Sequence, residues 1–92
     1  MIIRFKHKGL EKFFIKGVKS EIQAKHAERL RLILGRLNVS MNARDMALPG
    51  LNLHELSGNR RGTWSVKVGG NWRITFRFEG EHATDVEYED YH

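Results

Sequence analysis

Side chains that can transfer protons or hold a phosphate are concentrated in the second half of this 92-residue chain. They are His54, Arg60, Arg61, Arg73, Asp90, Tyr91 and His92. Histidine, aspartate and tyrosine can move protons, and arginine can hold a phosphate with two parallel hydrogen bonds. Metal-free cutting of RNA needs this combination, because a base must take the 2′-hydroxyl proton, cations must stabilise the phosphorane and an acid must protonate the leaving 5′-oxygen. The residue types therefore permit ribonuclease chemistry.

Each of these residues also has a plainer interpretation. The final Asp-Tyr-His could be a frayed chain end, and His54 could be a solvated surface histidine. Arg73 could pair with Glu87 or Glu89 across strands, while Trp64 and Trp72 are more typical of a core than of base stacking. The residues alone support a small basic α+β domain associated with nucleic acid.

The segment that must position these groups is 51–78, which predicts three short antiparallel strands. Gly58-Asn59 and Gly69-Gly70 are turn signals between runs that alternate apolar and polar residues. Because successive strand side chains point to opposite faces, one predicted face is apolar and needs a cover. It carries Trp64, Val66, Val68, Trp72, Ile74, Phe76 and Phe78, whereas Ser65, Lys67, Arg73, Thr75 and Arg77 form a polar face that we expect to meet water or a partner.

Two amphipathic segments in the first half can supply the cover. Apolar residues at 10, 13, 14 and 18 predict a helix that stops near Gly17. The run from Ser20 to Gln23 matches a capping box, so a second helix is expected from there to about Asn38. With residues 2–5 as an edge strand, the prediction is one two-layer α+β domain over residues 1–92.

Two further stretches complete the expected chain path. Ser40 could cap one more helical turn, and Pro49-Gly50 must form a turn. Gly80 permits a tight hairpin into a last strand, in which Thr84, Val86 and Tyr88 are expected to share one face.

The charge distribution favours a polyanionic partner. All 16 Lys and Arg lie within residues 1–78 beside only five acids, whereas residues 79–92 hold the other six acids. Phosphate neutralisation supplies most non-specific affinity for nucleic acid, although ordinary solubility charge would look similar.

Several function classes lack their signatures. The chain has no cysteine, no phosphate-binding glycine loop and no apolar run long enough to span a membrane. Its five histidines are scattered, so neither a metal nor another cofactor is expected. A cytoplasmic protein without a membrane partner is the resulting expectation.

At these residues the sequence resembles the HigB toxins of the RelE/ParE superfamily of bacterial toxin–antitoxin systems. The likeness runs through the opening IIRFKHKGLEKFF, the block LHELSGNRRGTWSVKVGGNWRITFRF and the closing VEYEDYH. It implies a microbial-RNase-like fold, with an antiparallel sheet packed against two N-terminal helices. It also implies an endoribonuclease that cuts mRNA in the ribosomal A site, and a helix-turn-helix antitoxin of the HigA type.

The same resemblance assigns roles to individual positions. His54, Arg73, Asp90, Tyr91 and His92 match the family's residues around the scissile phosphate. His92 or Asp90 would transfer protons with help from His54, Arg73 would stabilise the transition state, and Tyr91 would position or stack. RNA contacts are expected from Ser57, Arg60, Arg61 and Lys67. Some relatives carry a lysine where this chain has Ser57, so part of the phosphate clamp would be missing or supplied by Arg60 or Arg61.

Two alternatives stay open at this level. ParE-like members of the superfamily inhibit DNA gyrase, and a non-catalytic RNA- or ribosome-binding module would need only the basic surface. The strand histidine and the terminal Asp-Tyr-His favour the nuclease, because a gyrase inhibitor has no evident need of proton-transfer groups.

Overall fold

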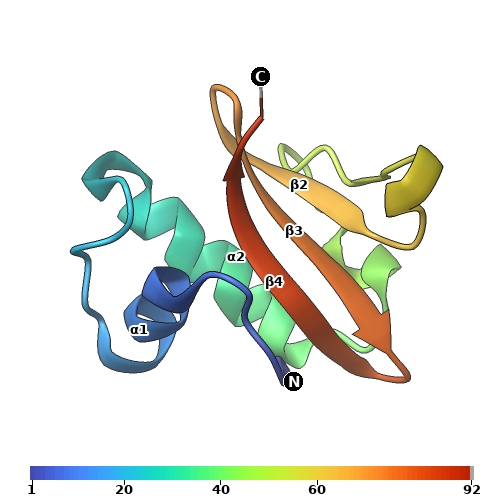
Figure 1. The fold of residues 1–92 in the computed structure, drawn as a ribbon, viewed down its shortest axis with the longest axis horizontal. Coiled ribbons are helices and arrows are strands. Elements are labelled where there is room, and N and C mark those ends of the chain that lie inside the picture. Colours follow the sequence, from blue (N-terminus) through green and yellow to red (C-terminus); the bar gives the residue numbers. More distant parts are fainter. Residues whose placement is uncertain (92) are drawn as a thin grey trace.

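Residues 1–91 are described by a computed structural model, in which two helices cover one face of a four-stranded antiparallel sheet (Figure 1). The helices are α1 (Lys8–Lys16) and α2 (Ala27–Val39), and the strands, in spatial as well as chain order, are β1 (His54–Glu55), β2 (Trp64–Gly69), β3 (Trp72–Glu79) and β4 (His82–Asp90). The predicted α+β class and the antiparallel sheet are therefore confirmed.

The core lies between the helices and the apolar face of the sheet. Val66, Ile74 and Phe76 are fully buried there, and so are Leu30 and Leu34 of α2. Trp64, Trp72 and Phe78 are partly buried and pack against this core, as their positions in the strands predict. Burial of one such side chain contributes about 1.5–3 kcal/mol, so the apolar alternation of 64–78 is what fixes the sheet against the helices.

Helix α1 begins and ends with recognisable caps. The Leu10 N–H donates to Nδ1 of His7 at the start. Gly17 ends the helix with φ +74°, in the left-handed region that glycine adopts at little cost. The predicted stop at Gly17 is correct, and Val18 lies beyond the helix with 40% of its surface exposed.

The capping box predicted at Ser20 is wrong. Residues 20–22 form a turn, and the chain becomes helical only at the 3-10 turn η1 (Ala24–His26), which leads into α2. Glu21 instead packs over α1, so closely that a Cβ added at Gly9 would lie 2.3 Å from the Glu21 Cβ. Packing between segments overrides the local capping signal at the start of the helix. The predicted end of the helix near Asn38 agrees with its last residue, Val39.

A further helical turn does follow α2, but its cap differs from the prediction. The turn is the 3-10 segment η2 (Ala43–Met46), and the side chain of Asn42 accepts from the Asp45 N–H at its start. The Ser40 hydroxyl instead donates to the Arg36 carbonyl. Pro49-Gly50 forms the expected turn.

Strand β4 contains a bulge that the sequence did not reveal. Thr75 lies opposite Glu87, but Arg77 lies opposite Thr84, so one extra residue is accommodated on β4. Asp85 has φ +53° at this point. Ala83 rather than Thr84 therefore shares the helix-facing side with Val86, which corrects the predicted alternation.

The N-terminal residues flank β4 on its outer side. Ile2 and Phe5 make isolated parallel bridges to Ala83 and Val86, on either side of the bulge. The expected edge strand at 2–5 thus joins the sheet, but as two separate bridges.

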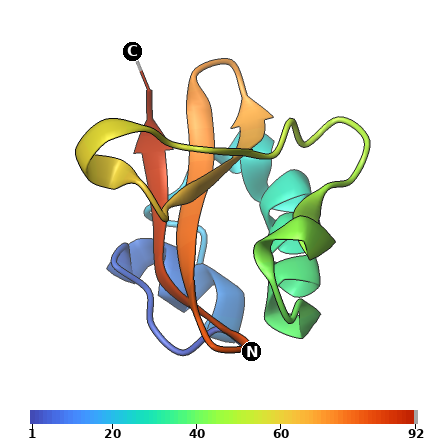
Figure 2. The ribbon, with the colours of Figure 1, turned by 90° about the vertical axis from the view of Figure 1, so that its right-hand side faces the viewer.

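The polar face of the sheet is partly covered, contrary to expectation. The connection between β1 and β2 contains the 3-10 turn η3 (Gly58–Arg60) and crosses in front of the strands (Figure 2). Ser65 and Thr75 are buried as a result, with 2% and 1% of their surface exposed. This face is called the open face below, because neither α1 nor α2 covers it. Within residues 1–91 no helix has the length and apolar character needed to cross a membrane.

Candidate active site

Arg73 lies in a row of polar residues at the end of the open face. Its cross-strand neighbours are Lys67 on β2 and Glu89 on β4. No ion pair joins Arg73 to Glu87 or Glu89 within the described chain. The cross-strand ion pair that the plainer interpretation of Arg73 expected therefore does not form. The Nη1 atom of Arg73 is buried and makes no hydrogen bond in residues 1–91. A buried guanidinium nitrogen without an acceptor is costly, and an incoming phosphate oxygen would supply that acceptor.

Glu89 is held by Arg60 from the loop above it. Both guanidinium Nη atoms of Arg60 donate to the Glu89 carboxylate, over 3.1 and 2.7 Å. The Thr75 hydroxyl donates to the same carboxylate over 2.5 Å. The Arg60 hydrogen bonds lower the pKa of Glu89, and Thr75 adds to the effect. Arg60, predicted to bind RNA, thus also ties the loop to the last strand.

The C-terminal segment runs alongside the NWRI strand. Asp90 lies opposite Trp72 in the register, and the Tyr91 N–H donates to the Asn71 carbonyl over 2.7 Å. Because Glu89 faces the open side, strand alternation directs Asp90 to the helix side. There Asp90 lines a hollow of about 500 Å³ with Lys25, His26 and Asn71. Tyr91 is 42% exposed, and His92 lies outside the described residues.

His54 stands two strands away from Arg73 on the open face. It pairs with Ser65, which pairs with Thr75, so about 10 Å of sheet separates its strand from β3. Its Nδ1 lies 3.1 Å from the Asn52 carbonyl oxygen. A carbonyl only accepts, so Nδ1 carries the proton and the Nε2 of the neutral ring is left as a proton acceptor.

The other predicted RNA contacts border this region. Ser57 precedes η3, and its side chain makes no cap hydrogen bond there. Arg61 and Lys67 are exposed. The structure therefore brings together four residues on the open face, Arg73, Lys67, Glu89 and Arg60. His54 lies on the same face but two strands away from Arg73, and Asp90 lies on the helix side of the sheet.

The sequence reasoning assigned no functional role to several residues at this end of the sheet. Tyr88 is buried, and its hydroxyl oxygen lies 2.6 Å from Nδ1 of His26. The centroid of its ring lies 4.4 Å from that of Trp72, with the two rings tilted by 31°. Burial lowers the pKa of His26 and raises that of Tyr88. Only the alternation of β4 hinted at Tyr88 as an inward residue, and nothing local marked Glu89 as the partner of Arg60.

Comparison with known proteins bears directly on this arrangement. Residues 3–92 match the family described as the RelE-like toxin of the type II toxin–antitoxin system HigB. The chain belongs to the HigB-like toxins. A relative named endoribonuclease HigB, from Proteus vulgaris, is 41% identical over 92 residues, which is the full length of both chains. This HigB-like chain thus has the family its motifs predicted. Among residues 1–91 no cluster of three or more His, Cys, Asp or Glu could hold a metal ion.

Proposed function

We propose that this HigB-like toxin is an endoribonuclease that cuts translated mRNA in the ribosomal A site without a metal ion. The observation that carries the proposal is Nη1 of Arg73, which is buried and makes no hydrogen bond within residues 1–91, beside the strand that leads into Asp90-Tyr91. The full-length likeness to an endoribonuclease supports the same conclusion. The proposal places the protein in the cytoplasm, where mRNA is translated.

The proposed chemistry follows from the residue types and from the roles that the family resemblance implies. The 2′-hydroxyl oxygen attacks the adjacent phosphorus while its proton passes to a base, and the P–O5′ bond breaks as an acid protonates the leaving oxygen. As the resemblance implies, we assign proton transfer to Asp90 or His92, with Nε2 of the exposed residue His54 assisting. Arg73 donates to the phosphorane oxygens as their charge grows, and Tyr91 positions or stacks on the strand.

The direct test is primer extension on translated mRNA. The wild type should give discrete cuts within A-site codons, and Arg73→Ala should reduce them by about 10²- to 10³-fold. Arg44→Ala, which removes the same charge from η2 on the helix side, is the matched control and should cut normally. Full cleavage by a variant lacking Tyr91 and His92 would rule out this site. Intact message with inhibited supercoiling would instead identify a gyrase inhibitor.

The family description also implies a neutralising partner. We propose a helix-turn-helix antitoxin of the HigA type, encoded beside the toxin. Co-purification of the product of the neighbouring reading frame, with loss of mRNA cutting, is the expected result. A neighbouring frame that neither binds nor inhibits would contradict it.

A further inference from the structure

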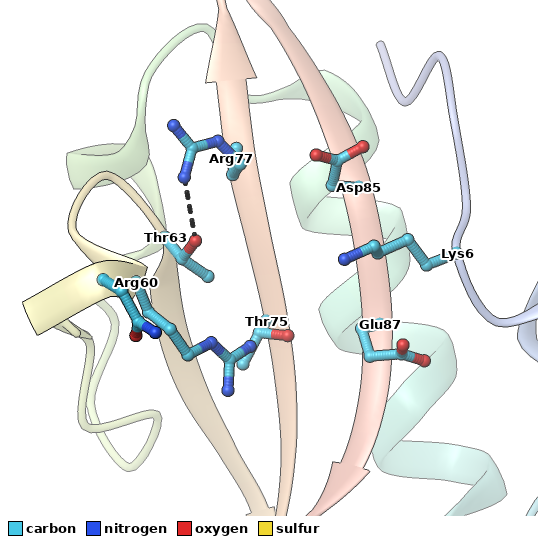
Figure 3. Close-up of a pocket in the computed structure, with 8 residues that line it drawn as sticks. Lys6, Arg60, Thr63, Thr75, Arg77, Asp85 and Glu87 are labelled. Atoms are coloured by element: carbon cyan, nitrogen blue, oxygen red, sulfur yellow. Dashed lines mark hydrogen bonds between the residues drawn. The ribbon is translucent and has the colours of Figure 1, made fainter. Parts of the chain in front are cut away.

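A second polar pocket lies on the open face, beyond the row that contains Arg73. It has a volume of about 300 Å³ and lies between the β1–β2 connection and the N-terminal segment. Figure 3 shows Arg60 and Lys6 reaching over β3 and β4 from opposite sides, with Arg77 farther along β3. Its lining is Lys6, Asn59, Arg60, Thr63, Thr75, Arg77, Asp85 and Glu87. Of these, only Arg60 was predicted from the sequence to bind RNA.

The cations of this pocket are only partly neutralised. Lys6 makes no ion pair within residues 1–91. The guanidinium of Arg77 is oriented by neutral acceptors, the Thr63 hydroxyl at 3.0 Å and the Arg61 carbonyl at 3.3 Å. Neither acceptor removes its charge, so Lys6 and Arg77 can both serve an anion.

The acids of the pocket differ from one another. Asp85 is paired with Arg4 at the rim. Glu87 forms no ion pair among the described residues, and one of its oxygens accepts only the N–H of the neighbouring Tyr88, over 3.3 Å. The pocket therefore offers two cations together with a carboxylate that retains acceptor capacity. A bare phosphate would not use that carboxylate, whereas a phosphate joined to a hydroxyl-bearing sugar would use both.

The pocket shares a wall with the proposed catalytic row. Thr75 and Arg60 line the pocket, and both bind Glu89, which lies opposite Arg73. Arg77 follows Arg73 by four residues on β3, a distance of about 13 Å along the strand. One RNA strand crossing the open face can therefore reach both places.

We propose that this pocket binds a ribose–phosphate unit of the RNA strand next to the bond that is cut. Lys6 and Arg77 hold the phosphate, and Glu87 accepts a hydrogen bond from the ribose 2′-hydroxyl, the group by which a protein distinguishes RNA from DNA. The inference rests on the proposed function in that it takes RNA as the ligand, but its test does not depend on cleavage.

The first experiment measures binding of a labelled single-stranded RNA to the purified toxin without ribosomes, over a series of salt concentrations. Lys6→Gln should weaken binding about three- to tenfold, and the slope of log affinity against log salt should become shallower by about 0.7, the loss of one phosphate contact. Lys6→Arg should restore both. Lys16→Gln removes the same charge from the end of α1 and is the control. Equal effects of Lys6→Gln and Lys16→Gln would overturn the pocket as a phosphate site.

The second experiment compares the same RNA with its all-2′-deoxy counterpart. Removing an acid raises general affinity for both strands, so the RNA-to-DNA affinity ratio is the informative quantity. Glu87→Ala should bring this ratio several-fold closer to one, while Glu81→Ala, in the exposed β3–β4 turn, should leave it unchanged. An unchanged ratio in Glu87→Ala would refute the ribose contact. If the wild-type toxin gave no A-site cuts in the primer-extension test, the two binding results would still hold. Failure of the proposed function can therefore be distinguished from failure of the pocket proposal.

Discussion

Replacing Arg60 by Met tests whether the loop on the open face holds the final strand in place. The substitution keeps much of the side-chain length but removes both guanidinium hydrogen bonds to Glu89. Thr75 still donates to that carboxylate, so Glu89 keeps one partner. The loop 57–62 and the strand that leads to Asp90 should both loosen.

The magnitude follows from the burial of the pair. The Arg60 side chain is 39% exposed and that of Glu89 is 22% exposed, so the pair lies between the exposed class, worth about 0.2–1 kcal/mol, and buried pairs, whose disruption costs about 3–5 kcal/mol. We expect a loss of about 1–2 kcal/mol in the free energy of unfolding. For a domain of this size that lowers the melting temperature by about 4–16 °C.

The assay is thermal and urea unfolding of Arg60→Met, Glu89→Gln and the double variant. Lys8→Met is the matched control, because in its pair with Glu11 the two side chains are 78% and 39% exposed, and the pair should contribute at most about 0.5 kcal/mol. The double-mutant cycle gives the coupling energy between Arg60 and Glu89. A coupling energy near zero, or an Arg60→Met melting temperature equal to that of the control, would refute the reasoning.

The pH dependence of the same variants gives an independent check. The pKa of Glu89 is lowered in the fold, below the ordinary value of 4.5. Its stabilisation is therefore complete above pH 4.5 and disappears as the pH falls through the lowered pKa. The stability difference between wild type and Glu89→Gln should be constant near neutrality and should shrink in acid. A difference that grows in acid would contradict the assignment.

Three further outcomes are expected. Burial, with a smaller effect of Lys25, lowers the pKa of His26 below 6.5, so the unfolded chain takes up its proton first; stability should fall as the pH drops through 6.5, and His26→Gln should flatten that part of a melting-temperature profile. Gly35→Ala should raise stability by about 1 kcal/mol in urea unfolding, because the new Cβ meets nothing within 4 Å in the middle of α2; a decrease would indicate an unseen contact. Leu34→Ala should cost about 2–5 kcal/mol because Leu34 is fully buried, whereas Leu32→Ala, at a position 70% exposed, should change the same urea midpoint by less than about 0.5 kcal/mol.

The sequence predicted the features that depend on periodicity. The alternation of 64–78 identified the apolar sheet face, and Gly17 marked the end of α1, because strand pleat and left-handed backbone leave local signals. Features that depend on packing between distant segments were missed. Ser20 carries a valid capping signal that the contact of Glu21 with Gly9 overrides.

The candidate site likewise contains features that the sequence predicted and features that it could not predict. The resemblance located the residue types, and the register brings Arg73 beside the strand that ends at Asp90. The bond of Arg60 to Glu89 could not be read, since nothing within a short window pairs residues 29 positions apart.

That extra residue makes one position of the last strand tolerant of a change in length. Before the bulge at Asp85 the odd-numbered residue Ala83 faces the helices, whereas after it the even-numbered residues from Val86 onward do so. Removing Asp85 would let the ladder run without a bulge, with Val86 opposite Phe76, and would leave Glu87 and Glu89 on the open face and Asp90 opposite Trp72 on the helix side. A single codon lost at the bend of this strand therefore keeps the same acids of the last strand on the ligand side, because the bulge absorbs the change in length.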